Sequence, residues 1–336
     1  MSSSDRGIVD FVGPTSLVIE TRIDPELRAA FRGLVSHDFS DLDAARLRSL
    51  ERPIAARPVD SASTVRVSVH SLETGDGSSI SVRFYTDAAR APRGVLVWAH
   101  GGGYVLGRAE QDDGVLRALT SETGCAVLAP DYRLAPEHPF PQPLEDIYAC
   151  LLAARTSEFG LGSDIPLLVG GSSAGGGLAA AAVLMAAERK EVHIAMQILV
   201  APMIDDRNVP ADDRSEPDPH VWSRPHNLFG WSAYLGRAFG TEVSPLAAAS
   251  RTTDFRGVCP TFIAVGDVDI FAVENIRYAA NAAAAGVPVE LHVYRGAFHG
   301  FATVAPQATV SRHFVESRNR AITKLFDGWG AEDAGC

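Results

Sequence analysis

The chain has 336 residues, of which 46% are hydrophobic and 21% charged. A chain of this size and composition can bury a large core without metal or disulfide support, and nothing in it is typical of disordered or fibrous proteins. The 30 basic and 41 acidic residues give a formal charge of −11, with no run of Lys or Arg. We therefore expect no nucleic-acid partner, because such partners select basic surfaces.

The sequence carries no sign of membrane targeting. Its first residues lack a positively charged segment followed by an apolar one, so no secretory signal is expected. The longest apolar run, residues 178–187, is far shorter than the roughly 20 residues that cross a bilayer. The four cysteines have neither C-x-x-C spacing nor paired histidines that would indicate zinc. We predict a cytoplasmic protein with reduced thiols, no membrane insertion and no bound metal.

Two short helices are predicted near the N-terminus. Residues 24–26 (Asp-Pro-Glu) are typical of a helix start, and residues 41–50 fit a second helix. Pro53 and Pro58 then interrupt regular structure. Residues 1–58 therefore lack the alternation of strands and helices predicted for the rest of the chain, and we interpret them as N-terminal cap helices.

After residue 58, short apolar runs alternate with helix-length segments. Residues 64–70 and 80–85 alternate polar and apolar side chains around a Gly-Asp-Gly turn, which indicates an antiparallel hairpin. Six further runs are predicted to be strands buried on both faces: 94–99, 125–130, 166–170, 194–201, 261–265 and 289–294. The helix-length segments are 109–123, 142–156, 174–190, 272–286 and 307–326. This alternation predicts an α/β fold with a mostly parallel eight-stranded sheet and helices on both faces.

Residues 204–250 interrupt the alternation. They are rich in Asp, Pro and Trp, and only 227–239 is predicted as a helix. Such insertions usually lie over the carboxyl ends of the strands, where open α/β sheets bind ligands. We therefore predict a cap insertion over 204–250 and an α/β core, carrying the chemistry, over 59–203 and 251–336.

The strongest chemical signal is Gly-Ser-Ser-Ala-Gly at 171–175, between a predicted strand and a predicted helix. This is the G-x-S-x-G nucleophile elbow in its required context, where small neighbours allow the sharp turn that exposes the central serine. Ser173 is favoured over Ser172 because only Ser173 is flanked symmetrically by glycines. The glycines from 175 also fit a dinucleotide fingerprint, but the next strand ends without the carboxylate that would hold a ribose.

A second glycine-rich motif, His-Gly-Gly-Gly at 100–103, follows the strand 94–99. Acyl transfer generates an oxyanion, and a glycine-rich loop brings backbone N–H donors close to it. The N–H of Ala174, directly after the nucleophile, would complete this oxyanion hole.

A nucleophilic serine needs a base and an orienting carboxylate, which in this arrangement follow in the order acid, then histidine. His299 is the favoured base because it lies in a loop after the last predicted strand. Asp267 and Asp269 both lie close enough to the end of strand 261–265 to serve as the acid.

Residues 100–103, 131–139 (Asp-Tyr-Arg-Leu-Ala-Pro-Glu-His-Pro) and 171–175 together resemble the hormone-sensitive-lipase-like (bacterial type IV) esterases of the α/β-hydrolase fold. The resemblance covers roughly residues 60–325. It implies a helical cap, and it implies Asp269 as the acid because the family's acid opens a segment similar to Asp-Ile-Phe-Ala-Val-Glu at 269–274. It also implies Gly102 and Gly103 as oxyanion donors beside Ala174. Ser172 departs from the family's usual Asp or Thr.

The expected function is hydrolysis of short- to medium-chain carboxylic esters through an acyl-enzyme on Ser173, with no cofactor. An amidase, a lactone hydrolase and a non-catalytic ligand receptor are the alternatives. Arg133 and Glu137 are expected to pair across the 131–139 loop. The family also suggests a homodimer formed through the edge strand near 289–294, a hypothesis that rests on no residue of this sequence. Four aromatic side chains are candidates for the substrate pocket: Tyr104, Trp222, Phe229 and Trp231.

Overall fold

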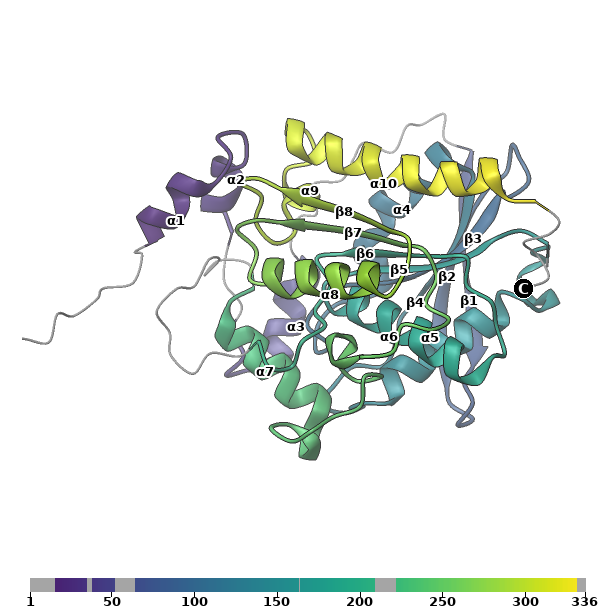
Figure 1. Cartoon of the computed structure of the whole chain (residues 1–336), viewed down its shortest axis with the longest axis horizontal. Coiled ribbons are helices and arrows are strands. Elements are labelled where there is room, and N and C mark those ends of the chain that lie inside the picture. The colour runs from purple at the N-terminus through teal and green to yellow at the C-terminus, as the bar shows by residue number, and fades with distance from the viewer. Residues whose placement is uncertain (1–15, 35–37, 52–63, 163, 209–221, 331–336) are drawn as a thin grey trace, which may run out of the picture.

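The computed structural model describes residues 16–34, 38–51, 64–162, 164–208 and 222–330 (Figure 1). One eight-stranded sheet runs through these residues in the order β1-β2-β4-β3-β5-β6-β7-β8. Both contacts of β2, with β1 and with β4, are antiparallel, and the other five pairings are parallel. The strands are β1 Val65–Glu73, β2 Ser79–Asp87, β3 Gly94–Ala99, β4 Cys125–Pro130, β5 Leu167–Ser172, β6 Met196–Val200, β7 Thr261–Gly266 and β8 Val289–Tyr294. The predicted α/β fold, with its antiparallel first hairpin, is confirmed.

The central strands are apolar at consecutive positions because both of their faces are covered. Every residue of β3 is buried. Val95 and Val97 contribute to the hydrophobic core on one face of the sheet, whereas Leu96 and Trp98 contribute to the core on the other. This two-residue period places the two helical layers on opposite sides of one sheet.

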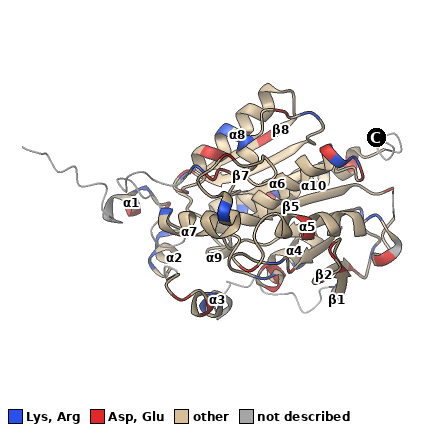
Figure 2. Cartoon of the chain, turned by 90° about the horizontal axis from the view of Figure 1, so that it is seen from below, with Lys and Arg blue, Asp and Glu red and all other residues tan. Residues whose placement is uncertain are grey.

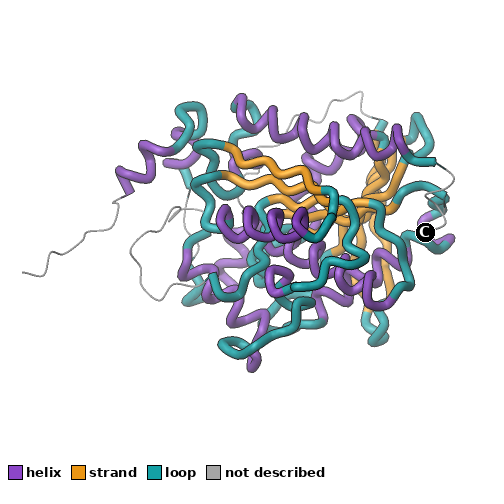
Figure 3. Tube along the Cα trace, in the orientation of Figure 1, coloured by secondary structure: helices purple, strands orange, loops and turns teal. Residues whose placement is uncertain are grey.

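Helices flank the sheet on both faces (Figure 3). The helices α4 Asp113–Thr123 and α10 Thr309–Gly328 cover one face, and α5 Gln142–Ala153, α6 Ala174–Arg189 and α8 Ala272–Ala284 cover the other. Charged residues lie mostly on outer helices and loops, whereas β5 and most of α6 carry none (Figure 2). The short 3₁₀ helices are η1 Ala109–Asp112, η2 Ser157–Phe159, η3 Gly236–Ala238 and η4 Ala249–Arg251.

The remaining helices gather at the end of the molecule toward which the parallel strands point (Figure 1). They are α1 Ser16–Arg22, α2 Arg28–Arg32, α3 Leu42–Glu51, α7 Arg224–Leu235 and α9 Phe301–Val304. Parts of the proposed cap segments, 1–58 and 204–250, lie outside the described residues. Within the parts described here, no helix is both long and apolar enough to cross a lipid bilayer.

Helix boundaries differ from the predicted ones where capping or turn chemistry intervenes. The predicted start at 24–26 forms a turn, in which Asp24 Oδ1 accepts the Glu26 N–H at 2.8 Å, and the helix begins only at Arg28. The insertion helix begins at Arg224, earlier than predicted, because the Ser223 hydroxyl caps its first turn. The predicted helix 109–123 starts as the 3₁₀ turn η1 before α4.

Candidate active site

The turn between β5 and α6 holds Ser173 in a strained conformation. Its φ of 55° and ψ of −122° are unusual for a residue with a side chain. A Cβ at Gly171 would lie 2.4 Å from the carbonyl carbon of Gly175, and a Cβ at Gly175 would lie 2.0 Å from the oxygen of Ala99. Both positions therefore require glycine for the turn to pack against β3. The turn stands at the N-terminus of α6, which favours negative charge.

Ser173, His299 and Asp269 come together from three separate segments. Ser173 Oγ lies 3.0 Å from His299 Nε2, and His299 Nδ1 lies 2.7 Å from Asp269 Oδ2. All three residues are buried. The second oxygen of Asp269, Oδ1, accepts the N–H of Phe271 at 2.9 Å, which fixes the carboxylate. The phenyl ring of Phe271 packs edge-on against the His299 ring with centroids 5.2 Å apart.

The glycine loop after β3 turns back on itself. Gly102 and Gly103 have φ values of 131° and 60°, and Gly102 O accepts the N–H of Leu106 at 2.8 Å. A Cβ at Gly102 would lie 2.1 Å from Leu106 O, and one at Gly103 would lie 1.9 Å from the Trp222 ring. Both glycines are therefore needed for the loop to close.

Three backbone N–H groups in the two glycine-rich motifs have no acceptor among the residues that the structure describes. Among the described residues, those of Gly102, Gly103 and Ala174 donate no hydrogen bond. Unpaired donors grouped beside a nucleophile can stabilise a developing oxyanion.

A cavity of about 510 Å³ opens over this serine. Ser172, Ser173, Asp269 and His299 lie in its wall. The segments proposed as the cap contribute Ala30, Gly33, Leu34, Ser49 and Trp222 to its wall. Further wall residues come from the α/β core and include His100, Gly101, Gly102, Asp112, Phe298 and Phe314. Most of its surface is apolar, as expected for a pocket that binds a small organic molecule.

Only one of the four aromatic candidates reaches this cavity. Trp222 lies in its wall. Tyr104 is buried instead, stacked on Tyr234 with ring centroids 4.0 Å apart, and its hydroxyl donates to Met203 O. Trp231 is fully buried in the same core, and Phe229 stacks on Phe39.

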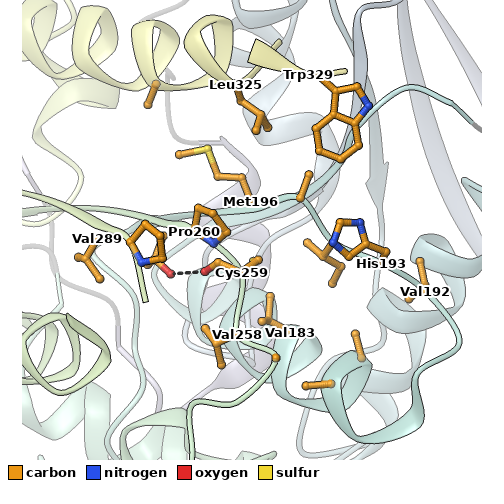
Figure 4. A pocket seen from close by; sticks show the side chains of 18 of the residues that line it. Val183, Val192, His193, Met196, Val258, Cys259, Pro260, Val289, Leu325 and Trp329 are labelled. Atoms are coloured by element: carbon orange, nitrogen blue, oxygen red, sulfur yellow. Dashed lines mark hydrogen bonds between the residues drawn. The ribbon is translucent and has the colours of Figure 1, made fainter. Parts of the chain in front are cut away.

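A larger cavity of about 1270 Å³ lies at the opposite end of the sheet, where β6, β7 and β8 begin (Figure 4). Its wall includes His193, Cys259 and Trp329 but no residue of the Ser173 cluster. Burial raises the pKa of the Cys259 thiol to about 12, so this sulfur is not an activated nucleophile. The smaller cavity, which contains the Ser173 cluster, is therefore the candidate active site.

Contacts far from the motifs hold the surroundings of the site. Buried Glu274, in the first turn of α8, accepts the N–H of Ile204 at 2.8 Å and the side-chain amide of Asn208 at 2.6 Å. It thus ties the start of the insertion to the segment that carries Asp269. The family segment 269–274 contains this glutamate, but the sequence alone did not indicate what it binds.

The expected pair between Arg133 and Glu137 does not form. Arg133 binds the carboxylate of Asp146 through Nε and Nη2, because that carboxylate is fully buried and needs a cation. Glu137 turns outward and binds Arg46 of α3 through both of its oxygens, each at 2.8 Å. The 131–139 loop thus connects the core to an N-terminal helix.

The chain is similar to known esterases over most of its length. A family with the α/β-hydrolase fold matches residues 96–303. The esterase LipI of Mycobacterium tuberculosis is 32% identical over 262 residues, which cover 75% of this chain and 79% of LipI. The carboxylesterase NlhH of the same organism is 30% identical over 300 residues, or 86% of this chain and 89% of NlhH. Among solved structures, a bacterial heroin esterase is 38% identical and superposes with a TM-score of 0.84, covering 91% of this chain and 98% of that one.

With Ser173 on a strand-to-helix turn and relatives of this kind, the class of protein is clear. The chain belongs to the hormone-sensitive-lipase-like family of the α/β-hydrolase fold. It is a serine carboxylesterase, as the sequence motifs predicted.

Proposed function

We propose that Ser173, His299 and Asp269 are the catalytic triad of this carboxylesterase, with the N–H groups of Gly102, Gly103 and Ala174 as its oxyanion hole. The observation that carries the proposal is the continuous chain of contacts from Ser173 Oγ through His299 to Asp269. Through Oδ2, Asp269 orients and charge-stabilises the imidazole, while its Oδ1 is held by the Phe271 N–H.

In the first half-reaction, Ser173 Oγ attacks the acyl carbonyl while His299 Nε2 takes the hydroxyl proton. The oxyanion that forms receives hydrogen bonds from the three backbone N–H groups. The bond from the acyl carbon to the alcohol oxygen then breaks, and His299 returns the proton to the leaving alcohol. Water deacylates Ser173 by the same route, with His299 again as base.

The acyl group is proposed to be short to medium in length. The cavity over Ser173 measures about 510 Å³, and residues from α2, α3 and the insertion close its outer side. Residues 1–58 and 204–250 are proposed to act together as the cap. We expect p-nitrophenyl acetate and butyrate to be hydrolysed faster than the octanoate, and the palmitate hardly at all. Palmitate turnover equal to that of butyrate would contradict the proposed chain length.

The roles of the two neighbouring serines can be separated directly. Ser173→Ala is expected to lower kcat for p-nitrophenyl butyrate by about 1,000-fold or more, because no nucleophile remains. Ser172→Ala is the matched control, since Ser172 lines the same cavity but contacts neither His299 nor Asp269. A fluorophosphonate probe should label wild type and Ser172→Ala but not Ser173→Ala. Activity or labelling that survives in Ser173→Ala would overturn the assignment.

Assembly and location complete the proposal. We propose a cytoplasmic enzyme acting on small-molecule esters without a nucleic-acid partner, which the net charge of −11 supports. Its homodimer would form through the edge strand β8, where Leu291 and Val293 are exposed. Size-exclusion chromatography coupled to light scattering tests the dimer, and a single species of subunit mass would contradict it.

A further inference from the structure

The wall of the active-site cavity contains a carboxylate that the mechanism does not use. Asp112, the last residue of η1, is half-buried and lines the cavity that also exposes Ser173 and His299. Its Oδ2 accepts the indole N–H of Trp98 at 2.7 Å. Its neighbour Asp113 faces away and is neutralised by Arg83 and Arg117. Two adjacent acids therefore have different surroundings, and of the two only Asp112 lines the cavity.

Within the part of the chain that the structure describes, no donor reaches the second oxygen of Asp112, Oδ1, and no Lys or Arg forms an ion pair with its carboxylate. Because Asp112 is only half-buried, this oxygen is not enclosed by the protein. Because Asp112 lines the cavity, a bound molecule can reach this acceptor.

The charge on Asp112 is incompletely compensated. Arg318 of α10 acts on it electrostatically, but burial outweighs this and raises the pKa of Asp112 to about 6. The carboxylate is thus still mostly ionised at pH 7 and above. A partly desolvated carboxylate without a paired cation gains from an added one.

The neighbouring polar groups in the wall add no positive charge. His100 lines the same cavity, and burial lowers its pKa to about 4, which leaves the ring neutral. Its Nδ1 donates to Gly101 O at 2.8 Å, so Nε2 is an acceptor, and it is buried without a partner. The Gln111 amide donates to Ser49 and not into the cavity.

Aromatic rings complete the wall. Trp222 lines the cavity together with Asp112. Phe298 and Phe314 also belong to the wall, but the Phe298 ring is fully buried against Phe31, and the guanidinium of Arg318 already lies over the Phe314 ring at 5.5 Å. A carboxylate combined with aromatic faces is the combination that recognises ammonium groups, through charge and cation–π attraction.

We propose that Asp112, with the indole ring of Trp222 in the same wall, forms a subsite for a cationic group, so that the enzyme prefers esters carrying an ammonium group in their acyl or alcohol part. This inference rests on the proposed function, because it names the substrate class of the same site. Asp112 binds the cation but takes no part in proton transfer or acyl transfer.

The test compares each cationic ester with its carbon isostere, in which a tert-butyl group replaces the trimethylammonium group. The acyl arm uses the p-nitrophenyl ester of trimethylammoniobutanoate, and the alcohol arm uses acetylcholine. For wild type at pH 8, we expect kcat/KM for the cationic ester to exceed that of its isostere by about tenfold or more in at least one arm. The arm that shows the preference identifies which part of the substrate contacts Asp112.

Asp112→Asn is expected to lower this cationic-to-neutral ratio by about tenfold, since the amide oxygen still accepts from Trp98 while the charge is lost. Glu110→Gln is the matched control, because it makes the same charge change in η1 at an exposed position outside the cavity. It should leave the ratio unchanged. Equal ratios in wild type and Asp112→Asn, or no preference in wild type in either arm, would overturn the subsite.

A second measurement needs no variant. Tetramethylammonium chloride should inhibit wild-type hydrolysis of the neutral isostere competitively, relative to sodium chloride at equal ionic strength. Absence of inhibition in the presence of normal turnover contradicts the subsite alone. Absence of turnover of every ester, the neutral ones included, contradicts the proposed function instead.

Discussion

Asp267 and Asp269 lie two residues apart in one loop, yet their carboxylates hold different parts of the site. Asp267 Oδ1 accepts the backbone N–H of Gly296 at 2.6 Å, whereas Asp269 Oδ2 meets His299 Nδ1 at 2.7 Å. One carboxylate therefore fastens the loop that carries the histidine, and the other contacts the histidine itself.

This division predicts very different effects of the same substitution. Asp269→Asn should lower kcat by about 100-fold to 10,000-fold, because an amide can present its N–H₂ to His299 and favour the wrong tautomer. Asp267→Asn should retain most activity, because its amide oxygen can still accept from Gly296. Steady-state kinetics on p-nitrophenyl butyrate, with circular dichroism to confirm folding, distinguishes them. Similar losses in both variants would contradict the division.

The fold and the candidate residues Ser173 and His299 could be predicted from local sequence patterns. The strands β3 to β7 are buried on both faces and read as continuous apolar runs, while the glycines around Ser173 reflect close backbone approach. The residues alone could not choose between Asp267 and Asp269, since both follow the same strand. The choice needed the family resemblance, and the structure shows the separate partners.

Two features of the site depend on side-chain direction, which the sequence does not reveal: which aromatic residues reach the cavity, and which acid lines it. Tyr104 and Trp231 are aromatic residues near the site, but their rings pack into the core, which residue type cannot reveal. Asp112 is one of two adjacent acids at a helix start, where acidic residues are common for electrostatic reasons. Only the structure shows that Asp112 faces the cavity and Asp113 does not.

Gly175 is predicted to be intolerant of even one added methyl group. In Gly175→Ala the new Cβ would lie 2.0 Å from Ala99 O, so α6 and Ser173 must shift. We expect the free energy of unfolding to fall by about 1–3 kcal/mol and kcat to fall by more than tenfold. Gly328→Ala is the matched control, since no atom lies within 4 Å of the added Cβ near the end of α10. Urea denaturation and ester hydrolysis measure both effects, and a fully active, stable Gly175→Ala enzyme would contradict the packing argument.

Arg46 is predicted to fasten α3 to the core. Its guanidinium donates to Val105 O and Ala135 O and binds both oxygens of Glu137. Arg46→Ala leaves these acceptors without their donor, so we expect a loss of about 1–3 kcal/mol in the free energy of unfolding. Arg48→Ala, on the same helix, should cost little, because the one hydrogen bond of the Arg48 side chain to another described residue is a 3.4 Å contact with Asp38 O. Equal unfolding midpoints for the two variants would contradict this role.

The ion pair between Arg46 and Glu137 predicts that the stability of the fold depends on pH. The hydrogen bond from Arg46 lowers the pKa of Glu137 from 4.5 to about 2. A depressed folded-state pKa stabilises the protein above the unfolded value of 4.5, and this stabilisation is lost as pH falls toward 2. The stability difference between wild type and Arg46→Ala should therefore shrink as pH is lowered from 6 to 3. Because the Glu137 side chain is half-exposed, solvent screening keeps this effect small. Thermal unfolding of both proteins across this range measures it, and a difference that stays constant or grows would contradict it.

The preference for cationic esters is expected to vary with pH, because it depends on the ionisation of Asp112. Burial raises its pKa from 3.8 to about 6, against the lowering effect of Arg318. The charged groups nearest in the chain, Glu110 and Asp113, are paired with arginines, and His100 stays neutral above its pKa of about 4. The ionised fraction of Asp112 therefore grows as pH rises through 6, and the ratio of kcat/KM for the cationic ester to that of its isostere should rise with it, reaching a plateau above pH 7.

This ratio isolates Asp112 because both substrates depend equally on the protonation of His299, whose effect cancels. In Asp112→Asn the ratio should be low and flat from pH 5 to 8. The stability effect has the opposite sign: a raised carboxyl pKa makes the folded state bind more protons between pH 4 and 6, so the contribution of Asp112 to stability falls as pH rises across that interval. Wild-type enzyme whose ratio does not change between pH 5 and 8 would contradict ionisation of Asp112 as the source of the preference.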